Sequence, residues 1–445
     1  MKRHLWTPLA SALTICIGLP VCASGQTVVP PLQGTSNYVQ NWNQLGDDTD
    51  ALTVENGFTL PSAGNAIING NRTIQVDSVI NTIAGNVFIN NSNNGVPDAP
   101  TGTLEINTGG SLSTGTVIVS VNDDAGTLAV QGGTLNAGGN GVEVRENGTV
   151  SITSGELNST GIITAEAGST FGISGGILNV NVTEGAALDL DGGNLDISGG
   201  TVTLTDPAPG GGAFVVTNAN NTGAINVSGG EFRVEGLTAG SDTVSFGNDV
   251  INISGGTFDV SGGQVFAGND TQFNIIGDAA TIQLDRLNLA TATRQSTFNF
   301  VFDSDGVSTV ENDFFLALSE ANLLVDGSAY EGGMGSFDLF TSGNLTAGFD
   351  LDNVTVTGLG VEGVDFTLVQ ATGSGEGNGN ITLNVMTEDA LKGDVDLSGA
   401  VNFLDIPPFI TALTMGSNQP EADTNCDGIV NFLDISPFIG ILAGG

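Results

Sequence analysis

Two twelve-residue segments close to the C-terminus carry the most specific chemistry in this sequence. The first runs from Asp394 to Asp405 and the second from Asp423 to Asp434, so equivalent positions lie 29 residues apart. In both segments, side chains that contain oxygen occupy positions 1, 3, 5, 9 and 12, and glycine occupies position 6. This spacing surrounds a hard cation with about six to eight oxygen ligands, as in a calcium loop of the EF-hand kind. Because two separate loops share it, the sequence predicts two calcium ions.

A short apolar helix is predicted after each loop. The runs from Ile406 to Leu413 and from Ile435 to Leu442 carry proline close to their first residue, at Pro407 and Pro437. The first turn of a helix tolerates proline, because its missing N–H has no partner within the helix there. Glycines after each run supply the stops. No amphipathic helix of matching length precedes either loop, so each unit is a loop followed by one helix.

This duplicated unit, with aspartate instead of glutamate at position 12, resembles a type I dockerin module over residues 391–445. The resemblance implies a cohesin-type partner and a ligand at each loop position. The implied ligands of the first loop are Asp394, Asp396, Ser398, the carbonyl of Ala400, Asn402 and Asp405. Those of the second are Asp423, Asn425, Asp427, the carbonyl of Ile429, Asn431 and Asp434. The asparagines at position 9 are expected to act through water.

The two loops depart from the dockerin pattern in two respects. Ser398 stands at position 5 of the first loop, where Asp or Asn is usual, which predicts a weaker first site. Positions 10 and 11 usually carry small polar residues that select the cohesin, and here they are Phe403-Leu404 and Phe432-Leu433. These apolar pairs leave two alternatives open, namely recognition of a partner and packing within this molecule.

The N-terminus has the layout of a secretory signal peptide. Lys2-Arg3-His4 precede an apolar stretch from Leu5 to Val21, and small residues follow at Cys22-Ala23-Ser24. We therefore expect residues 1–24 to be removed and the protein to be extracellular or to lie at the cell surface. No other segment approaches the roughly 20 apolar residues that a membrane span requires, so no span is predicted.

Composition excludes several kinds of chemistry. Removal of residues 1–24 deletes the single histidine and two of three cysteines, leaving Cys426. Ser-His-Asp and Cys-His nucleophiles, histidine-bound zinc and intrachain disulfides are then impossible.

The formal charge is −40, from 48 acidic and 8 basic residues. Nucleic acid is excluded as a natural partner, because phosphate binding requires clustered Lys and Arg. Hydrophobic residues make up 39%, enough for a folded core.

A short sequence motif recurs between about residues 105 and 270. Polar or β-branched residues are followed by Gly-Gly or Ser-Gly, one further residue and an apolar anchor. The first spacings between anchors are 23, 22 and 21 residues, a period typical of solenoids. Between the glycines, polar and apolar residues alternate, as in strands with one buried face. The anchors are Leu112, Leu135, Leu157, Leu178, Leu195, Phe232 and Phe258.

These repeats predict a right-handed parallel β-helix. The L-x-x-L-x-L core of leucine-rich repeats and the register of the calcium-binding nonapeptide roll are both missing. Each coil of about 20 residues is expected to place leucine inside, and Asn, Thr and Ser in ladders outside. The style of the repeat is similar to the passenger regions of secreted bacterial adhesins and autotransporters.

The predicted fold class is therefore mainly β, with three parts after the signal peptide. Residues 25–270 form the β-helix, with an N-terminal cap around Trp42. Residues 271–388 form a β-rich C-terminal cap module, expected to be antiparallel, in which Phe298, Phe300 and Phe302 alternate along one strand. Residues 391–445 form the small α-helical dockerin-like domain.

Two functions remain open at this stage. The first is a secreted calcium-binding structural or adhesive β-helix, which contacts a cell surface or a polysaccharide and docks through its terminal module. The alternative is a carbohydrate-active protein of polysaccharide breakdown, which as an enzyme would be a hydrolase or a lyase.

A glycosidase requires two carboxylates about 5–9 Å apart across the scissile bond. The candidate carboxylates are Asp123-Asp124, Asp189 with Asp191, Asp303 with Asp305, and Asp285 beside Arg286. A lyase would require calcium, carboxylates and a base, for which Arg145 or Arg233 is the candidate. The coils contain no Trp or Tyr on which a sugar ring would stack, and no catalytic residue is assigned.

Overall fold

The computed structural model describes the central and C-terminal parts of the chain almost continuously and short pieces of the N-terminal part. The described residues are 27–28, 40–41, 52–54, 66–68, 73–77, 79–80, 85–91, 102–121, 125–182, 186–206, 213–217, 223–238, 242–267, 270–289, 296–360, 365–374, 379–386, 392–396, 398, 401–415, 419–425 and 429–444. The expected signal peptide and the side chain of Trp42 lie outside them. So do residues 387–391, between the β region and the terminal module.

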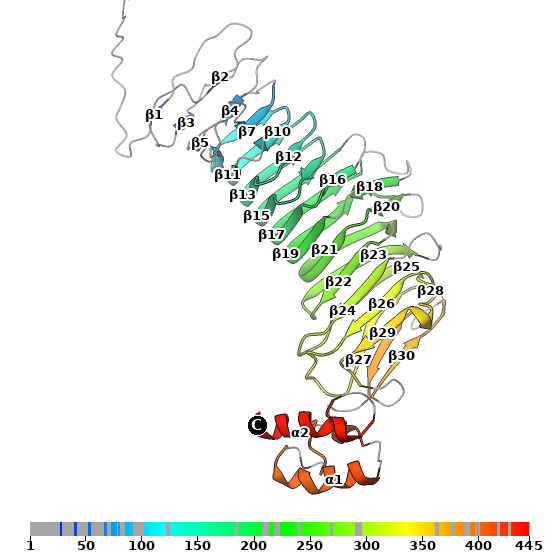
Figure 1. Ribbon diagram of the computed structural model, residues 1–445. Helices are drawn as coiled ribbons and strands as arrows, with labels where there is room; N and C mark the ends of the chain where they lie inside the picture. Colours follow the sequence, from blue (N-terminus) through cyan, green and yellow to red (C-terminus); the bar gives the residue numbers. More distant parts are fainter. Residues whose placement is uncertain are drawn as a thin grey trace, which may run out of the picture.

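The strands form one sheet that winds into a parallel β-solenoid, which confirms the predicted fold class (Figure 1). Each coil adds strands to three parallel ladders. The first ladder contains β1 (Thr27–Val28), β3 (Leu52–Val54), β5 (Thr73–Val76), β8 (Gly102–Asn107), the first parts of β11 (Gly126–Ala137), β13 (Thr149–Ser159), β15 (Thr170–Val180), β17 (Asn194–Thr205), β19 (Ala224–Glu235) and β21 (Val250–Ala267), then β22 (Gln272–Ile276), β24 (Thr297–Val301), β26 (Asn322–Asp326) and β29 (Val354–Thr357).

The other two ladders complete each coil. The second contains β6 (Val79–Ile80), β9 (Ser111–Thr114), the later parts of β11 to β21, and β23 (Ala280–Asn288), β25 (Val310–Ala317) and β27 (Gly335–Ser342). The third contains β2 (Gln40–Asn41), β4 (Ala66–Ile68), β7 (Val87–Asn91), β10 (Val117–Val121), β12 (Val142–Val144), β14 (Ile163–Ala165), β16 (Ala186–Asp189), β18 (Ala213–Thr217), β20 (Thr243–Phe246), the ends of β21, β23 and β25, and β28 (Asn344–Ala347).

The repeated apolar anchors stack on one another inside the coils. Leu112, Leu135, Leu157 and Leu178 are in register on consecutive coils, and all are buried. Further along, Phe232 stacks on Phe258 with ring centroids 5.1 Å apart. Burial of about 25 cal/mol per Å² of apolar surface makes this column the main stabilising element of the shaft.

One of the predicted anchors was assigned to the wrong ladder. Leu195 pairs with Phe171 and Ile225 in the first ladder, whereas the residue in register with Leu178 and Phe232 is Val202. Gly199 and Gly200 precede Val202 at the corner between the ladders, whereas Gly192 and Gly193 precede Leu195. The error arose because two Gly-Gly pairs occur in this coil and only one of them lies at the corner between the ladders.

Asparagine ladders run along the outside of the coils, as predicted. The Asn252 amide donates to Asn226 Oδ1 at 2.6 Å, and Asn274 donates to Asn252 Oδ1 at 2.7 Å. A second ladder joins Asn179, Asn158 and Asn136 at 2.8 and 3.0 Å. Each amide donates to one coil and accepts from the next, so the register of neighbouring coils is fixed by side chains as well as by backbone.

The prediction of an antiparallel module from residue 271 is wrong over most of that region. Strands β22, β24, β26 and β29 continue the first parallel ladder, and Phe298 stacks on Phe273 with centroids 4.9 Å apart. The dense phenylalanines therefore fill the last coils of the solenoid. Among the described strands, antiparallel ladders form at its end, where β32 (Ile381–Val385) joins β27 and β30 (Phe366–Gln370), and β28 joins β31 (Gly373–Ser374).

The two helices lie at the C-terminal end of the chain, beyond the last strands (Figure 1). Helix α1 spans Ile406–Met415 and helix α2 spans Ile435–Gly444, which confirms both predicted helices and extends each by two residues. They enclose a small apolar core separate from the core of the solenoid. Its buried members are Val395, Phe409, Ala412, Ala422, Val430 and Phe438. We call the described residues from 392 to 444 the C-terminal module.

Candidate metal centre

The first predicted loop brings three carboxylates together. Oxygen atoms of Asp394, Asp396 and Asp405 all lie within 4.8 Å of one another. Asp394 and Asp405 are buried, and Asp396 is exposed. Clustered carboxylates at this separation repel one another unless protons or a cation lie among them. A set of hard oxygen donors is the set that calcium prefers.

Asp405 is held in place by the loop that it closes. Its Oδ1 accepts from the Asp396 N–H at 3.0 Å, and its Oδ2 accepts from the Asn402 N–H at 2.8 Å. The Asn402 side chain in turn accepts from the Leu404 N–H at 2.9 Å, which completes a capping box in front of α1. Such a box satisfies N–H groups that the helix leaves unbonded, and the helix dipole favours the negative charge there.

The second loop repeats this geometry. Asp434 Oδ1 accepts from the Asn425 N–H at 3.0 Å, and Oδ2 accepts from the Asn431 N–H at 2.7 Å. Both position-12 carboxylates, Asp405 and Asp434, are 0% exposed. Asp423 is buried as well, and the Lys392 ammonium donates to its carbonyl oxygen at 3.2 Å. In both loops, therefore, the aspartate at position 12 accepts from the backbone N–H groups of positions 3 and 9.

Most of the implied ligands lie at these loops, although some are engaged within the protein. The Ser398 N–H donates to Asp394 Oδ1 at 2.9 Å and to Asp396 Oδ1 at 3.0 Å. The Asn431 amide donates to the Ile429 carbonyl at 2.9 Å. Ala400 and Asp427, at position 7 of the first loop and position 5 of the second, lie outside the described residues.

Contacts between the two units were not foreseen from the sequence. Phe409 of α1 stacks on Phe438 of α2, with ring centroids 3.9 Å apart and planes 8° from parallel. The Gly393 N–H donates to the Glu421 carbonyl at 2.9 Å. Gln419 donates to the Val395 carbonyl at 2.8 Å. The sequence feature that could have predicted this stacking is the position of the two phenylalanines, since each comes four residues after the last aspartate of its loop. They therefore lie at equivalent positions on the two helices. Each loop is therefore supported by the other unit.

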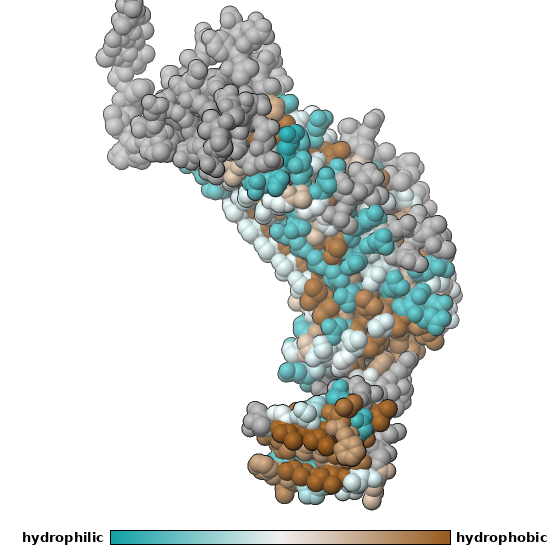
Figure 2. Space-filling model, in the orientation of Figure 1, coloured by the Kyte–Doolittle hydropathy of each residue, from teal (hydrophilic) through white to brown (hydrophobic). Residues whose placement is uncertain are grey.

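The apolar pairs at positions 10 and 11 project from this module. Phe403 is 78% exposed and Phe432 is 84% exposed, and Leu404 and Leu433 are also exposed. Figure 2 shows hydrophobic residues gathered on the module. The described structure therefore does not pack these pairs within the molecule. Exposed apolar residues of this size, held on a rigid support, are typical of a protein-protein contact surface.

The carboxylates considered for catalysis do not form a recognisable active site in the described residues. The Asp303 carboxylate accepts from the N–H groups of Asp305 and Gly306, both at 2.9 Å. Although partial burial opposes it, this bonding holds the pKa of Asp303 below its usual range. Arg145 and Arg233 form ion pairs with neighbouring glutamates. Asp123-Asp124 lie outside the described residues.

Asp189 lies near a carboxylate that the sequence gave no reason to select. Asp249 is buried, and burial raises its pKa, although hydrogen bonds from Thr217 and Gly223 offset part of the rise. The charge of Asp189 adds to the rise. Asp191 follows β16 and is exposed.

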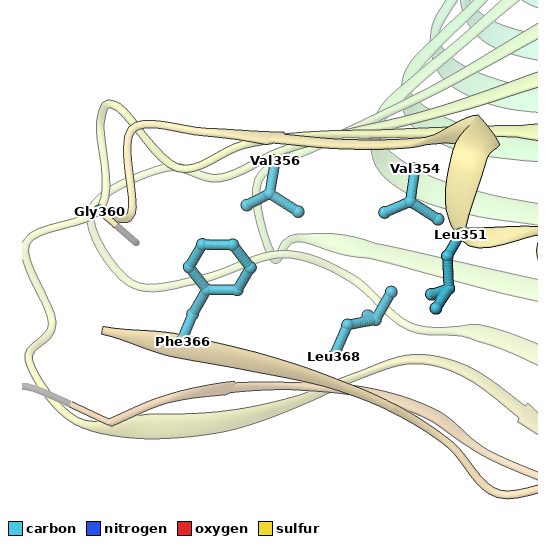
Figure 3. A pocket seen from close by; sticks show the side chains of 6 residues that line it. All are labelled: Leu351, Val354, Val356, Gly360, Phe366 and Leu368. Carbon is cyan, nitrogen blue, oxygen red and sulfur yellow. The ribbon is translucent and has the colours of Figure 1, made fainter. Parts of the chain in front are cut away.

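An apolar pocket of about 290 Å³ lies between β29 and β30 at the end of the solenoid. Figure 3 shows Val354 and Val356 facing Phe366 and Leu368 across it, with Leu351 at one end. Among the described residues, those that line the pocket carry apolar side chains.

Comparison with known proteins adds no identity to this description. No protein-family model, curated protein or solved structure matches the chain. Among the described residues, no helix reaches the length and apolarity that a bilayer crossing requires. The architecture and the paired loops therefore define the protein as a parallel β-solenoid that carries a small C-terminal helical module.

Proposed function

We propose that this protein is an exported structural or adhesive β-solenoid whose C-terminal module binds two calcium ions and docks to a cohesin-type partner. The observation that carries the proposal is the duplicated loop geometry. In each loop a fully buried aspartate at position 12 accepts two backbone N–H groups of its own loop, at 2.7 to 3.0 Å. Its remaining lone pairs are available to a cation, and the aspartates at position 1 supply further oxygen atoms.

The solenoid fits the role of a shaft in this proposal. Its coils are joined by backbone ladders and asparagine ladders that repeat along its length, which gives an extended and stiff body. An acidic surface suits an extracellular setting rich in calcium and salt. Export is supported by the signal-peptide pattern of residues 1–24.

Calorimetric titration of the full chain without residues 1–24 tests calcium binding directly. We expect two ions per chain, with the second loop binding more tightly because the first carries Ser398 at position 5. Asp434→Asn should remove the tighter step, and Asp338→Asn, in β27, should leave both ions bound. Absence of binding heat, or calcium binding no tighter than the binding of magnesium, would contradict the proposal.

Docking is expected to depend on the exposed Phe-Leu pairs. In calcium buffer, we expect the protein to bind at least one member of a panel of immobilised type I cohesin domains. Phe403→Asp combined with Phe432→Asp should abolish that binding while leaving two calcium ions bound, because both side chains are exposed and neither is an implied calcium ligand. Either single variant should retain binding if the two units are equivalent surfaces.

The measurement is surface plasmon resonance, repeated in EGTA. Leu324→Asp, at an apolar site on the solenoid that is also exposed, serves as the control. A double variant that binds as well as the native protein would contradict the assignment of the docking surface. Failure to bind any cohesin would contradict the partner class and leave the calcium sites standing.

A further inference from the structure

The first ladder ends in a layer of apolar core that is only partly covered. Val354 and Val356 in β29 are in register with Leu323 and Val325 of the preceding coil, which are 0% and 1% exposed. Both valines of β29 are partly buried, although they belong to the same inner columns. In the coils before them, the strand that follows in the ladder covers each layer. No described strand follows β29, so its apolar side chains remain accessible to a partner.

These valines form one wall of the pocket of about 290 Å³, and Phe366 and Leu368 of β30 form the other (Figure 3). The Gln370 side chain ties the two walls together. Its Oε1 accepts from the Phe349 N–H at 2.7 Å, and its Nε2 donates to the Phe349 carbonyl at 3.1 Å. Because these bonds fix the separation of the walls, the pocket is preformed, and a ligand gains affinity from that rigidity. We call this pocket the terminal slot.

Both strands that border the terminal slot are edge strands. β29 pairs with β26 and β30 pairs with β32, and no other described strand pairs with either. Each therefore presents one backbone edge that has no ladder partner among the described strands. An added strand pairs with such an edge through main-chain hydrogen bonds, and its alternate side chains enter a neighbouring pocket. The terminal slot and its edges together have the geometry of a site for β-augmentation.

The charge around the terminal slot favours a basic occupant. Residues 296–386 contain 13 Asp and Glu and no Lys, Arg or His. Asp350 and Asp352 are exposed close to one end of the slot. At the other end the Asp365 carboxylate lies beside Gly360, where an added Cβ would be 2.2 Å from its Oδ2. Acidic segments are repelled from such a surface, whereas lysine and arginine side chains complement it.

We propose that the terminal slot binds an extended segment of another protein in which apolar residues alternate with lysine or arginine. The segment adds a strand to β29, its apolar side chains fill the slot, and its basic side chains lie over the acidic surface. A second copy of this chain is disfavoured as the occupant, because each copy carries a formal charge of −40. This contact is separate from the calcium module and gives the shaft a partner of its own.

Fluorescence anisotropy at about 0.15 M salt tests the proposal with a labelled peptide of about seven residues, in which lysine and valine alternate. Two peptides of the same length serve as controls, one of lysine and serine and one of glutamate and valine. Both should bind about tenfold more weakly or worse, because the first lacks apolar side chains and the second is repelled. Hydrogen exchange of the β29 amides should slow when the lysine-valine peptide binds. Equal binding of the lysine-serine peptide would show attraction by charge alone and would overturn the proposal.

Leu351→Ser and Leu368→Ser should each weaken binding of the lysine-valine peptide by about tenfold, because both side chains line the slot. Leu351 is 67% exposed, so its replacement leaves the fold intact, which an unchanged thermal transition verifies. Val369→Ser is the matched control, since Val369 lies on β30, is 47% exposed and does not line the slot. Absence of binding by the native protein, or native affinity in Leu351→Ser, would overturn the proposal.

Two further measurements separate this site from other places of binding. The variant that combines Phe403→Asp with Phe432→Asp should bind the peptide as the native protein does, and loss of binding there would place the site in the C-terminal module, against the proposal. Sedimentation velocity of the protein without peptide should show a monomer. A dimer that Leu351→Ser dissociates would make a second copy the occupant and would also overturn the proposal.

Discussion

Replacing Asp434 with alanine is expected to unfold the C-terminal module and to leave the melting transition of the solenoid unchanged. The side chain is fully buried and accepts the N–H groups of Asn425 and Asn431. Each of these charge-assisted bonds contributes about 1.5–3 kcal/mol. The variant also loses a proposed ligand, and calcium at about 100 times its dissociation constant adds about 2.7 kcal/mol. A single small core cannot offset losses of this size, because domains of this length are marginal.

Differential scanning calorimetry measures this outcome. The native protein in calcium should show two transitions, and EGTA should remove the smaller one, because the buried aspartates then repel one another without a cation. Glu331→Ala, which removes an exposed carboxylate from the solenoid, should change neither transition. The solenoid should be indifferent to calcium, because its coils contact only their neighbours and its core shares no residue with the module. One calcium-dependent transition for the whole chain would contradict the division into shaft and module.

Local patterns in the sequence predicted the fold well where the structure of a segment depends only on residues within that segment. Alternation in segments such as Thr149–Thr153 predicted strands with one buried face, and the burial pattern of β13 follows it. Proline after each loop predicted where both helices begin. The paired aspartates predicted the cluster at the first loop, because the spacing of ligands within a loop is fixed by the local backbone.

Features that depend on contacts between neighbouring coils could not be predicted from the sequence. The place of Leu195 in the first ladder depends on which Gly-Gly pair forms the corner, and the local pattern is the same for both. The parallel pairing of Phe298 with Phe273 and Leu323 depends on strands more than 20 residues away. The contact between Arg286 and Phe314 likewise depends on the register shift between β23 and β25, which only the next coil reveals. Residue propensity and hydrophobic periodicity describe one strand at a time, whereas the register describes how two strands pair. The register therefore cannot be predicted from the pattern of a single strand.

Replacing Gly230 with alanine is expected to lower the unfolding free energy of the solenoid by about 3 kcal/mol or more. Gly230 lies at the corner between the first two ladders with a φ of +66°, which is in the left-handed region. A Cβ atom there would lie 2.5 Å from the Gly200 carbonyl oxygen and 2.6 Å from the Gly199 carbonyl carbon. Both are backbone atoms held in ladders, so they cannot move aside as a flexible side chain would.

Gly172→Ala provides the matched control, because the nearest atom to its Cβ is the Val150 carbonyl oxygen at 4.0 Å and its φ is not left-handed. That variant should be neutral or slightly stabilising, since alanine restricts the unfolded chain. Urea unfolding followed by far-UV circular dichroism compares the two. The same corner recurs at Gly200 and Gly256, whose added Cβ atoms would lie 2.4 and 2.5 Å from the glycine carbonyl of the preceding coil. Alanine there should cost as much as at Gly230, and equal stability of the corner and control variants would show that the corner does not require glycine.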